Sequence, residues 1–231
     1  MIAEVGVVIP VADEEERLPA CLDALDVARA CVNRGLTVRV VVVLDGCTDR
    51  SEAIARARKD IDVLTVRLGR VGAVRAAGVR RVLHDAAPQQ LWIANTDADS
   101  TVPADWLSGM VALAEADADG DINGGADVVL GTVVPGPGLA DAMHRRWHAQ
   151  HTLRDGHRHV HGANFGIRAD AYLAARGWPD VSSGEDELLA ARALATGARI
   201  VRTGALPVTT STRLIGRAPR GFSSYLRGLA G

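Results

Sequence analysis

Cysteine is scarce in this chain and shows no metal-ligand spacing. The 231 residues include three cysteines, Cys21, Cys31 and Cys47, an odd number typical of neither a disulfide framework nor a zinc site. No signal-like segment precedes the first apolar run. We therefore expect a protein of the reducing cytoplasm.

Long apolar runs and an excess of one charge are also missing. The longest runs, such as Val40–Leu44, are far below the roughly 18 residues that cross a bilayer. We expect no transmembrane segment, although contact with a membrane surface stays open. The 26 basic and 28 acidic residues give a net charge of -2, which provides no general attraction for nucleic acid or anionic lipid. Any phosphate site must be local, and no nucleic-acid partner is expected.

The remaining composition is that of an ordinary globular protein, with 48% hydrophobic and 23% charged residues. A chain of this length holds one full-sized α/β domain and is too short for two enzyme domains with separate cores. We expect a single domain over residues 1–231.

Strands and helices alternate through the first part of the chain. Val5–Val11 is a short apolar run rich in β-branched residues, which is typical of a strand buried on both faces. Leucines at three- and four-residue steps then indicate a helix that Gly35 stops. Further strands are predicted over 38–44, 63–68 and 91–94, and further helices after Asp49 and over 71–82. This order predicts a Rossmann-like, doubly wound α/β fold with a mainly parallel central sheet and helices on both faces.

The second half is less regular. Helices are predicted over 103–115, 140–153, 185–196 and a short final stretch that contains Phe222 and Tyr225, and strands over 126–134, 160–168, 198–201 and 207–210. The glycine-rich residues 120–125 indicate a surface loop.

Acidic residues follow two of the buried strands. In such sheets ligands bind beyond the carboxyl ends of the strands, so Asp45 and Asp97 should point into one crevice. Asp97 and Asp99 would lie on the same side of an extended backbone, where two carboxylates repel unless a cation or a proton intervenes. Mg²⁺ or Mn²⁺ suits such oxygen ligands. The alternatives are a solvated turn at 97–99 and a capped strand-to-helix turn at 45–49.

Four segments together resemble the family-2 glycosyltransferases with the GT-A nucleotide-sugar-binding fold. They are Val7–Glu15, Val43–Asp49, Asn95–Asp99, and His161–Phe165 with Gly184–Leu188. They occur in the family's order and spacing and cover about 190 residues. The resemblance implies a GT-A-type sandwich in which residues 1–100 bind a nucleotide-sugar donor and residues 101–231 bind the acceptor.

The resemblance also implies roles for individual residues. Its nucleoside-binding positions match Pro10, Val11, Glu14 and Asp45. Arg75 would lie near the base or the diphosphate. Asp97 would face the ribose and the metal, and Asp99 would ligate the Mg²⁺ or Mn²⁺ that neutralises the diphosphate leaving group. Asp186 matches the carboxylate that inverting members use as general base. The chain departs from the family's usual Asn, Ser and Asn at Asp13, Cys47 and Ala76.

The acids of residues 185–187 also have a purely structural interpretation. Ser183 predicts a helix N-cap, and each acid in the first turn stabilises a helix by about 0.3–1 kcal/mol through the helix dipole. The same dipole makes Asp186 a weaker base, so catalysis also requires burial or a second carboxylate such as Glu185. A retaining outcome stays open if Asp186 does not reach the acceptor.

Histidines and arginines of the second half are candidates for acceptor or phosphate contacts. His144, His148 and His151 share one face of a predicted helix, but no Cys partners or His-Glu-x-x-His pattern supports zinc. We expect the histidines of residues 144–161 to line an acceptor-side segment. The residues assigned to acceptor or phosphate are His161, Asn164, Arg213 and Arg217. A solvated basic terminus is the alternative for the two arginines.

Together these patterns favour a metal-dependent transfer of a sugar from a nucleoside-diphosphate sugar to the hydroxyl of an unidentified acceptor. One alternative is a sugar-nucleotide-binding protein without turnover. Another is a sugar-1-phosphate nucleotidyltransferase, although that class has a Gly-rich, Arg-containing loop where this chain has Pro10–Asp13. No Gly-x-Gly-x-x-Gly follows a strand, which disfavours a dehydrogenase.

Overall fold

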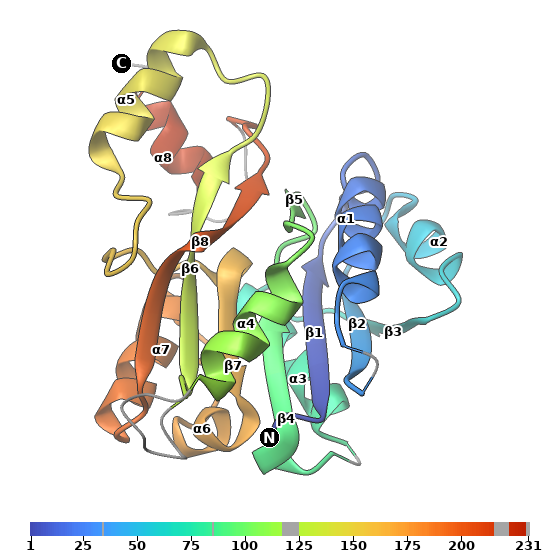
Figure 1. The fold of residues 1–231 in the computed structure, drawn as a ribbon. Coiled ribbons are helices and arrows are strands. Elements are labelled where there is room, and N and C mark those ends of the chain that lie inside the picture. The colour runs from blue at the N-terminus through green and yellow to red at the C-terminus, as the bar shows by residue number, and fades with distance from the viewer. Residues whose placement is uncertain (34, 85, 117–124, 215–221, 230–231) are drawn as a thin grey trace.

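The computed structural model describes residues 1–33, 35–84, 86–116, 125–214 and 222–229. These residues build an eight-stranded sheet with the strand order β3-β2-β1-β4-β7-β6-β8-β5. Helices cover both faces of the sheet (Figure 1). The expected α/β class with a mainly parallel central sheet is confirmed.

The first half alternates strand and helix as the apolar runs predict. Its elements are β1 (Glu4–Val11), α1 (Leu18–Ala30), β2 (Thr37–Asp45), α2 (Ser51–Arg56), β3 (Ile61–Val66), α3 (Val71–Leu83), the short helix η1 (Pro88–Gln90) and β4 (Leu91–Asn95). Strand β1 pairs in parallel with both β2 and β4, and β2 pairs in parallel with β3. The carboxyl ends of β1, β2 and β4 therefore lie at one edge of the sheet.

The second half mixes strand directions. Its elements are β5 (Ser100–Thr101), α4 (Trp106–Glu115), β6 (Val128–Pro135), α5 (Asp141–Gln150), η2 (Gly162–Asn164), β7 (Phe165–Arg168), α6 (Ala169–Ala174), α7 (Glu185–Ala195), β8 (Ile200–Thr210) and α8 (Phe222–Leu229). Strand β7 runs antiparallel between β4 and β6. Its register places Phe165 opposite Asn95, so the start of β7 lies beside the end of β4.

Two expectations for this half are wrong in detail, and one helix was not predicted. The two short strands at 198–201 and 207–210 form the single strand β8, whose register against β6 shifts between Gly131 and Val133. The breakers Gly204 and Pro207 fall at this irregularity, which explains the apparent gap. The strand predicted from Val160 begins only at Phe165, because η2 precedes it, and helix α6 was not foreseen.

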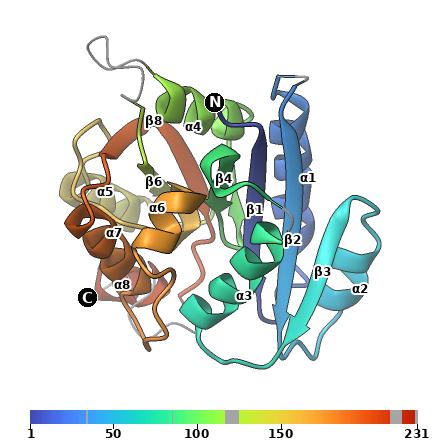
Figure 2. The ribbon, with the colours of Figure 1, turned by 90° about the horizontal axis from the view of Figure 1, so that it is seen from below.

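The strands carry a core on each face, as expected for runs buried on both sides. Val7 and Ile9 belong to one core cluster with residues of α1 and α4, whereas Val8 belongs to the other with residues of α3 and α7. Figure 2 shows α3 and α4 on opposite sides of the strands. The alternation of strand side chains thus packs both layers.

A separate pair of helices lies beyond the ends of β6 and β8 (Figure 1). Helices α5 and α8 enclose a small apolar cluster in which Trp147 and Leu226 are fully buried. Within the described ranges, no helix is both long enough and apolar enough to cross a membrane.

Asn164 joins three elements in the interior. Its side chain is fully buried, and its amide nitrogen donates to the carbonyl oxygens of Thr132 and Leu206 at 2.8 and 2.7 Å. Its side-chain oxygen accepts a hydrogen bond from the indole nitrogen of Trp106 at 2.9 Å. The amide therefore satisfies groups of β6, β8 and α4 that have no access to water.

We predict that Asn164→Ala lowers the free energy of unfolding by about 3 kcal/mol or more, because it leaves three buried polar partners unpaired and opens a cavity. Urea denaturation measures the loss. Gln89→Ala at an exposed position is the control and should stay within about 0.5 kcal/mol of the wild type. A change of similar size in both variants would contradict the assignment.

Candidate active site

Arg75 is the centre of an ion-pair network at the carboxyl edge of the sheet. It projects from α3 and is buried, with 2% of its surface exposed. Its guanidinium donates to Asp97 Oδ1 at 2.6 Å and to Glu185 Oε1 at 2.7 Å. The same group lies over the ring of Trp178, with 5.0 Å between the guanidinium carbon and the ring centre. One side chain thus connects α3, the end of β4 and the start of α7.

The pKa values of Arg75 and Asp97 are both raised above their usual values. Burial opposes the charge of Arg75, but Asp97, Glu185 and the nearby Asp186 raise its pKa above the usual value. Burial also raises the pKa of Asp97, while the charge of Arg75 opposes the increase and that of Asp99 adds to it. Arg75 therefore stays charged.

Asp186 lies next to this network on the first turn of α7. Its Oδ2 accepts a hydrogen bond from the backbone nitrogen of Gly162 at 2.9 Å, and its Oδ1 accepts one from Glu187. A Cβ at Gly162 would lie 2.5 Å from the Arg75 guanidinium, so only glycine allows this approach. The N-cap is Gly184, at φ +75°, rather than the predicted Ser183. A backbone in that conformation favours glycine.

A second arginine bridges acids from two other segments. Arg213 follows β8 and contacts Glu14 Oε1 at 2.6 Å and Asp99 Oδ2 at 2.9 Å. Asp99 Oδ2 also accepts a hydrogen bond from the Ser211 hydroxyl at 2.7 Å. Glu14 comes from the loop after β1, so this bridge ties the chain beyond β8 to both β1 and β4.

The extended backbone expected over Asp97–Asp99 is wrong. The chain turns after Asp97, whose carbonyl oxygen accepts a hydrogen bond from the backbone nitrogen of Ser100 at 3.1 Å. Asp97 therefore pairs with Arg75 and Asp99 with Arg213. The two carboxylates are still close enough for the charge of Asp99 to raise the pKa of Asp97.

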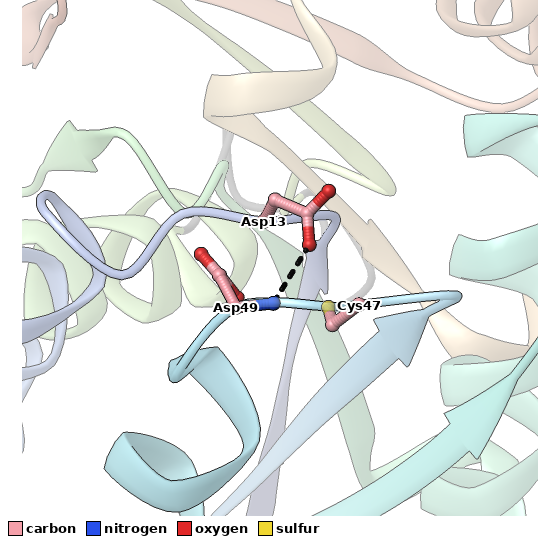
Figure 3. A group of neighbouring side chains, drawn as sticks. All are labelled: Asp13, Cys47 and Asp49. Carbon is pink, nitrogen blue, oxygen red and sulfur yellow. Dashed lines mark hydrogen bonds between the residues drawn. The ribbon is translucent and has the colours of Figure 1, made fainter.

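Asp45 and Asp13 organise the neighbouring turns. Asp45 accepts hydrogen bonds from the backbone nitrogens of Leu68 and Gly69, at 2.6 and 2.9 Å. Asp13 Oδ1 accepts from the backbone nitrogens of Thr48 and Asp49, at 2.6 and 3.2 Å. Figure 3 shows the bond between Asp13 and the backbone nitrogen of Asp49, on the turn after β2. The hydrogen bond from the backbone nitrogen of Thr48 lowers the pKa of Asp13.

The cluster of Asp13, Cys47 and Asp49 brings ligand-type atoms within 4.8 Å of one another. Both carboxylates already accept hydrogen bonds from backbone N–H groups. Those of Thr48 and Asp49 donate to Asp13, and those of Glu15 and Ser51 donate to Asp49. Burial raises the pKa of the Cys47 thiol, and a protonated sulfur is a poor ligand for Mg²⁺ or Mn²⁺. These contacts explain the cluster as a lock between two loops.

The pair Asp99 and Glu14 fits a hard divalent ion better. Both are carboxylates, the Ser211 hydroxyl adds an oxygen, and a cation, Arg213, already lies between them. Oxygen donors of this kind are the ones that Mg²⁺ and Mn²⁺ prefer. The donor set therefore accommodates the expected metal at Asp99.

The histidines form a stacked row that leads towards the site. Ring centres are 4.2 Å apart between Trp147 and His151, 4.9 Å between His151 and His159, and 5.8 Å between His159 and His161. Burial, with His159 as the next cause, lowers the pKa of His161 to about 4. The row therefore ends in a neutral imidazole directly before Gly162.

The other candidate residues lie as follows. Pro10 is half-buried at the end of β1. The Val11 side chain is buried, and the Val11 carbonyl oxygen accepts a hydrogen bond from the Cys47 thiol at 3.5 Å. Asn164 lies in the interior, with its amide engaged as described above. Arg217 lies outside the described residues.

Sequence reasoning did not identify Trp178 or Ser211 as site residues. Trp178 lies under Arg75, and Ser211 donates to Asp99. The turn signal of Gly177 and Pro179 around the tryptophan is the only local hint. Nothing in the sequence near Ser211 indicates its partner.

Comparisons with known proteins identify the family and the fold. The model of the family described as Glycosyl transferase family 2 matches residues 6–173. S. aureus TarS 1–349 in complex with UDP-GlcNAc is similar at 17% identity and TM-score 0.68, over 98% of this chain and 65% of that chain. The mannosyltransferase PcManGT from Pyrobaculum calidifontis, in complex with GDP-Man and Mn²⁺, is similar at 20% identity and TM-score 0.63, over 96% and 59%.

GalNAc-T7 with UDP, GalNAc and Mn²⁺ is a further similar structure, at 12% identity and TM-score 0.65, over 94% of this chain and 46% of that chain. The chain thus spans less than two thirds of the length of each of these proteins. No curated protein matches it by sequence. At these identities the likeness establishes the fold, and the expected GT-A-type sandwich is confirmed.

We predict that Arg75→Met lowers the free energy of unfolding by about 3 kcal/mol or more, because it leaves Glu185 and Asp97 without their buried partner. Chemical denaturation measures the effect. Arg70→Met is the control: Arg70 pairs with Asp180 at 2.7 Å, but both side chains are more than half exposed, so the loss should be about 0–1 kcal/mol. Equal losses would contradict a buried network.

We predict that His161 makes the stability of the protein pH-dependent, because its pKa in the folded protein, about 4, lies below the usual 6.5. The unfolded chain takes up the proton first, so stability falls as the pH decreases from about 6.5 to about 4, by at most about 1.4 kcal/mol per pH unit. His161→Gln should reduce this slope in denaturation curves recorded across that window. Parallel curves for the two proteins would show that His161 titrates normally.

Proposed function

This chain belongs to glycosyl transferase family 2, and from that membership we propose that it moves a sugar from a nucleoside-diphosphate sugar to an acceptor hydroxyl. By family and fold it is a glycosyltransferase. Residues 1–100 serve as the donor half and residues 101–231 as the acceptor half of a single domain.

The observation that carries the proposal is the convergence of distant acids on two arginines. Arg75 joins Asp97 and Glu185, and Arg213 joins Asp99 to Glu14, although these partners are far apart in the chain. Concentrating carboxylates in this way costs free energy unless cations offset them. Such a concentration supports a site that binds a metal and a diphosphate.

We propose that Mg²⁺ or Mn²⁺ binds at Asp99, with Glu14 as the second carboxylate and with Asp97, which is paired with Arg75, facing the ion. TarS was solved with UDP-GlcNAc, and PcManGT and GalNAc-T7 with Mn²⁺, which supports a nucleotide and a divalent ion here. A bound ion would offset the negative charge that develops on the departing diphosphate.

The donor is held by the loops at the carboxyl ends of β1 and β2. Pro10 and the Val11 backbone border the nucleoside, and Glu14 lies at the phosphate end. Asp45 orders the loop after β3 through Leu68 and Gly69 and keeps lone pairs for a base imide or a ribose hydroxyl.

Asp186 is the proposed general base for an inverting displacement. Two backbone N–H groups fix its carboxylate at the start of α7, and each oxygen keeps a lone pair for the acceptor proton. Glu185 is proposed as a positioning residue, because its contact with Arg75 fixes the turn that carries Asp186. His161, a neutral imidazole directly before Gly162, is an acceptor contact.

We predict that the protein slowly releases nucleoside diphosphate from a UDP- or GDP-sugar in the presence of Mn²⁺. Asp99→Asn should stop the release, because it removes the proposed metal ligand. Asp186→Asn should keep donor affinity but lower acceptor-dependent transfer by about 10²–10⁴-fold. Product release is followed by chromatography, and Asp60→Asn, at an exposed position, is the control.

The outcomes separate the alternatives. Donor binding without release would identify a sugar-nucleotide-binding protein, and pyrophosphate formation from a sugar 1-phosphate and a nucleoside triphosphate would identify a nucleotidyltransferase. Release that continues unchanged in Asp99→Asn would remove the metal from the proposal.

A further inference from the structure

The two arginine bridges differ in how easily they open. The Arg75 side chain is 3% exposed and that of its partner Glu185 is 11% exposed. The Arg213 side chain is 26% exposed, although Glu14 and Asp99 around it are 6% and 14% exposed. Arg75 is thus part of the interior, whereas Arg213 reaches two sheltered carboxylates from the solvent side.

Arg213 occupies the lone pairs that a metal at Asp99 needs. Its NH2 lies 2.9 Å from Asp99 Oδ2, and its NH1 lies 2.6 Å from Glu14 Oε1. The Ser211 hydroxyl donates to the same Asp99 oxygen. A guanidinium and a divalent ion both satisfy two such carboxylates, but close like charges repel. The two cations therefore compete for the same pair of acids.

The segment that carries Arg213 stays near the site when the side chain moves. The backbone nitrogen of Ser211 donates to the Asp99 carbonyl oxygen at 3.1 Å, and the Thr212 hydroxyl donates to the Pro137 carbonyl oxygen at 3.0 Å. Neither contact involves the guanidinium. Arg213 can therefore leave the two acids by rotation of its own side chain.

We propose that Arg213 is a built-in counter-cation that a divalent ion displaces from Glu14 and Asp99, and that the displaced guanidinium then binds the nucleotide diphosphate. This inference rests on the proposed metal at Asp99. Arginine suits the second role because its planar fork matches phosphate oxygens. As a result, Arg213 weakens the binding of the metal alone and strengthens that of the diphosphate once the metal is present, which couples the two ligands.

Isothermal titration calorimetry tests both halves without turnover. Arg213→Gln should bind Mn²⁺ at least about threefold more tightly than the wild type, because a competing charge-assisted contact is gone. In saturating Mn²⁺ it should bind UDP or GDP at least about threefold more weakly. Arg17→Gln is the matched control, since Arg17 lies 3.9 Å from Glu14 and shows no contact with Asp99 among the ion pairs of the described residues. Its affinities should stay within about twofold of the wild type.

The variant Arg213→Gln should bind Mn²⁺ more tightly but UDP or GDP more weakly, and these opposite changes in affinity make the result decisive. Unchanged or weaker Mn²⁺ binding in Arg213→Gln overturns the competition, and unchanged UDP and GDP binding overturns the coupling. If this variant folds poorly, Arg213→Lys, which cannot span both carboxylates, must still raise Mn²⁺ affinity. Asp99→Asn separates this inference from the proposed function: Mn²⁺ affinity equal to the wild type in that variant would remove the metal site itself.

Discussion

The buried guanidinium of Arg75 is the interaction on which the site depends. It contacts Asp97 at the end of β4 and Glu185 at the start of α7, and Trp178 lies against its face. The charge of Arg75 is tolerable in this environment only while its carboxylate partners remain, and the sheltered Glu185 in turn requires the arginine. Arg75 therefore links the donor half and the acceptor half by ion pairs as well as by packing.

The first half of the fold could be predicted because its signals are local. Strands β1 and β2 are β-branched runs with a core on both faces, and each helix between strands begins and ends near polar or glycine residues. The second half contains breakers within elements. Gly204 and Pro207 lie inside β8, where the register against β6 is irregular and accommodates them. Because β6 is far from residues 204–207 in the sequence, the local pattern does not reveal that the strand continues.

The site could be predicted as a set of acids but not as a set of contacts. Asp97 and Asp99 were predicted from their positions after a strand, and Asp186 from the resemblance to the family. The contacts between the site residues were not predicted, because Arg75 and Glu185 are 110 positions apart and Arg213 and Glu14 are 199 apart. Contacts at such separations depend on the complete topology. The extended backbone expected at 97–99 was wrong for a local reason, because the chain turns there.

The antiparallel insertion of β7 has a geometric consequence. Its ladder with β4 joins four residue pairs, from Trp92–Arg168 to Asn95–Phe165, and together with the ladder to β6 it sets where Gly162 meets Asp186 relative to Asp97. A slip of one residue would exchange the two faces of β7, bring Gly166 or Asn164 opposite Asn95, and carry the glycine about 3.3 Å along the strand. The place of the Gly162–Asp186 contact relative to Asp97 is therefore a product of strand alignment.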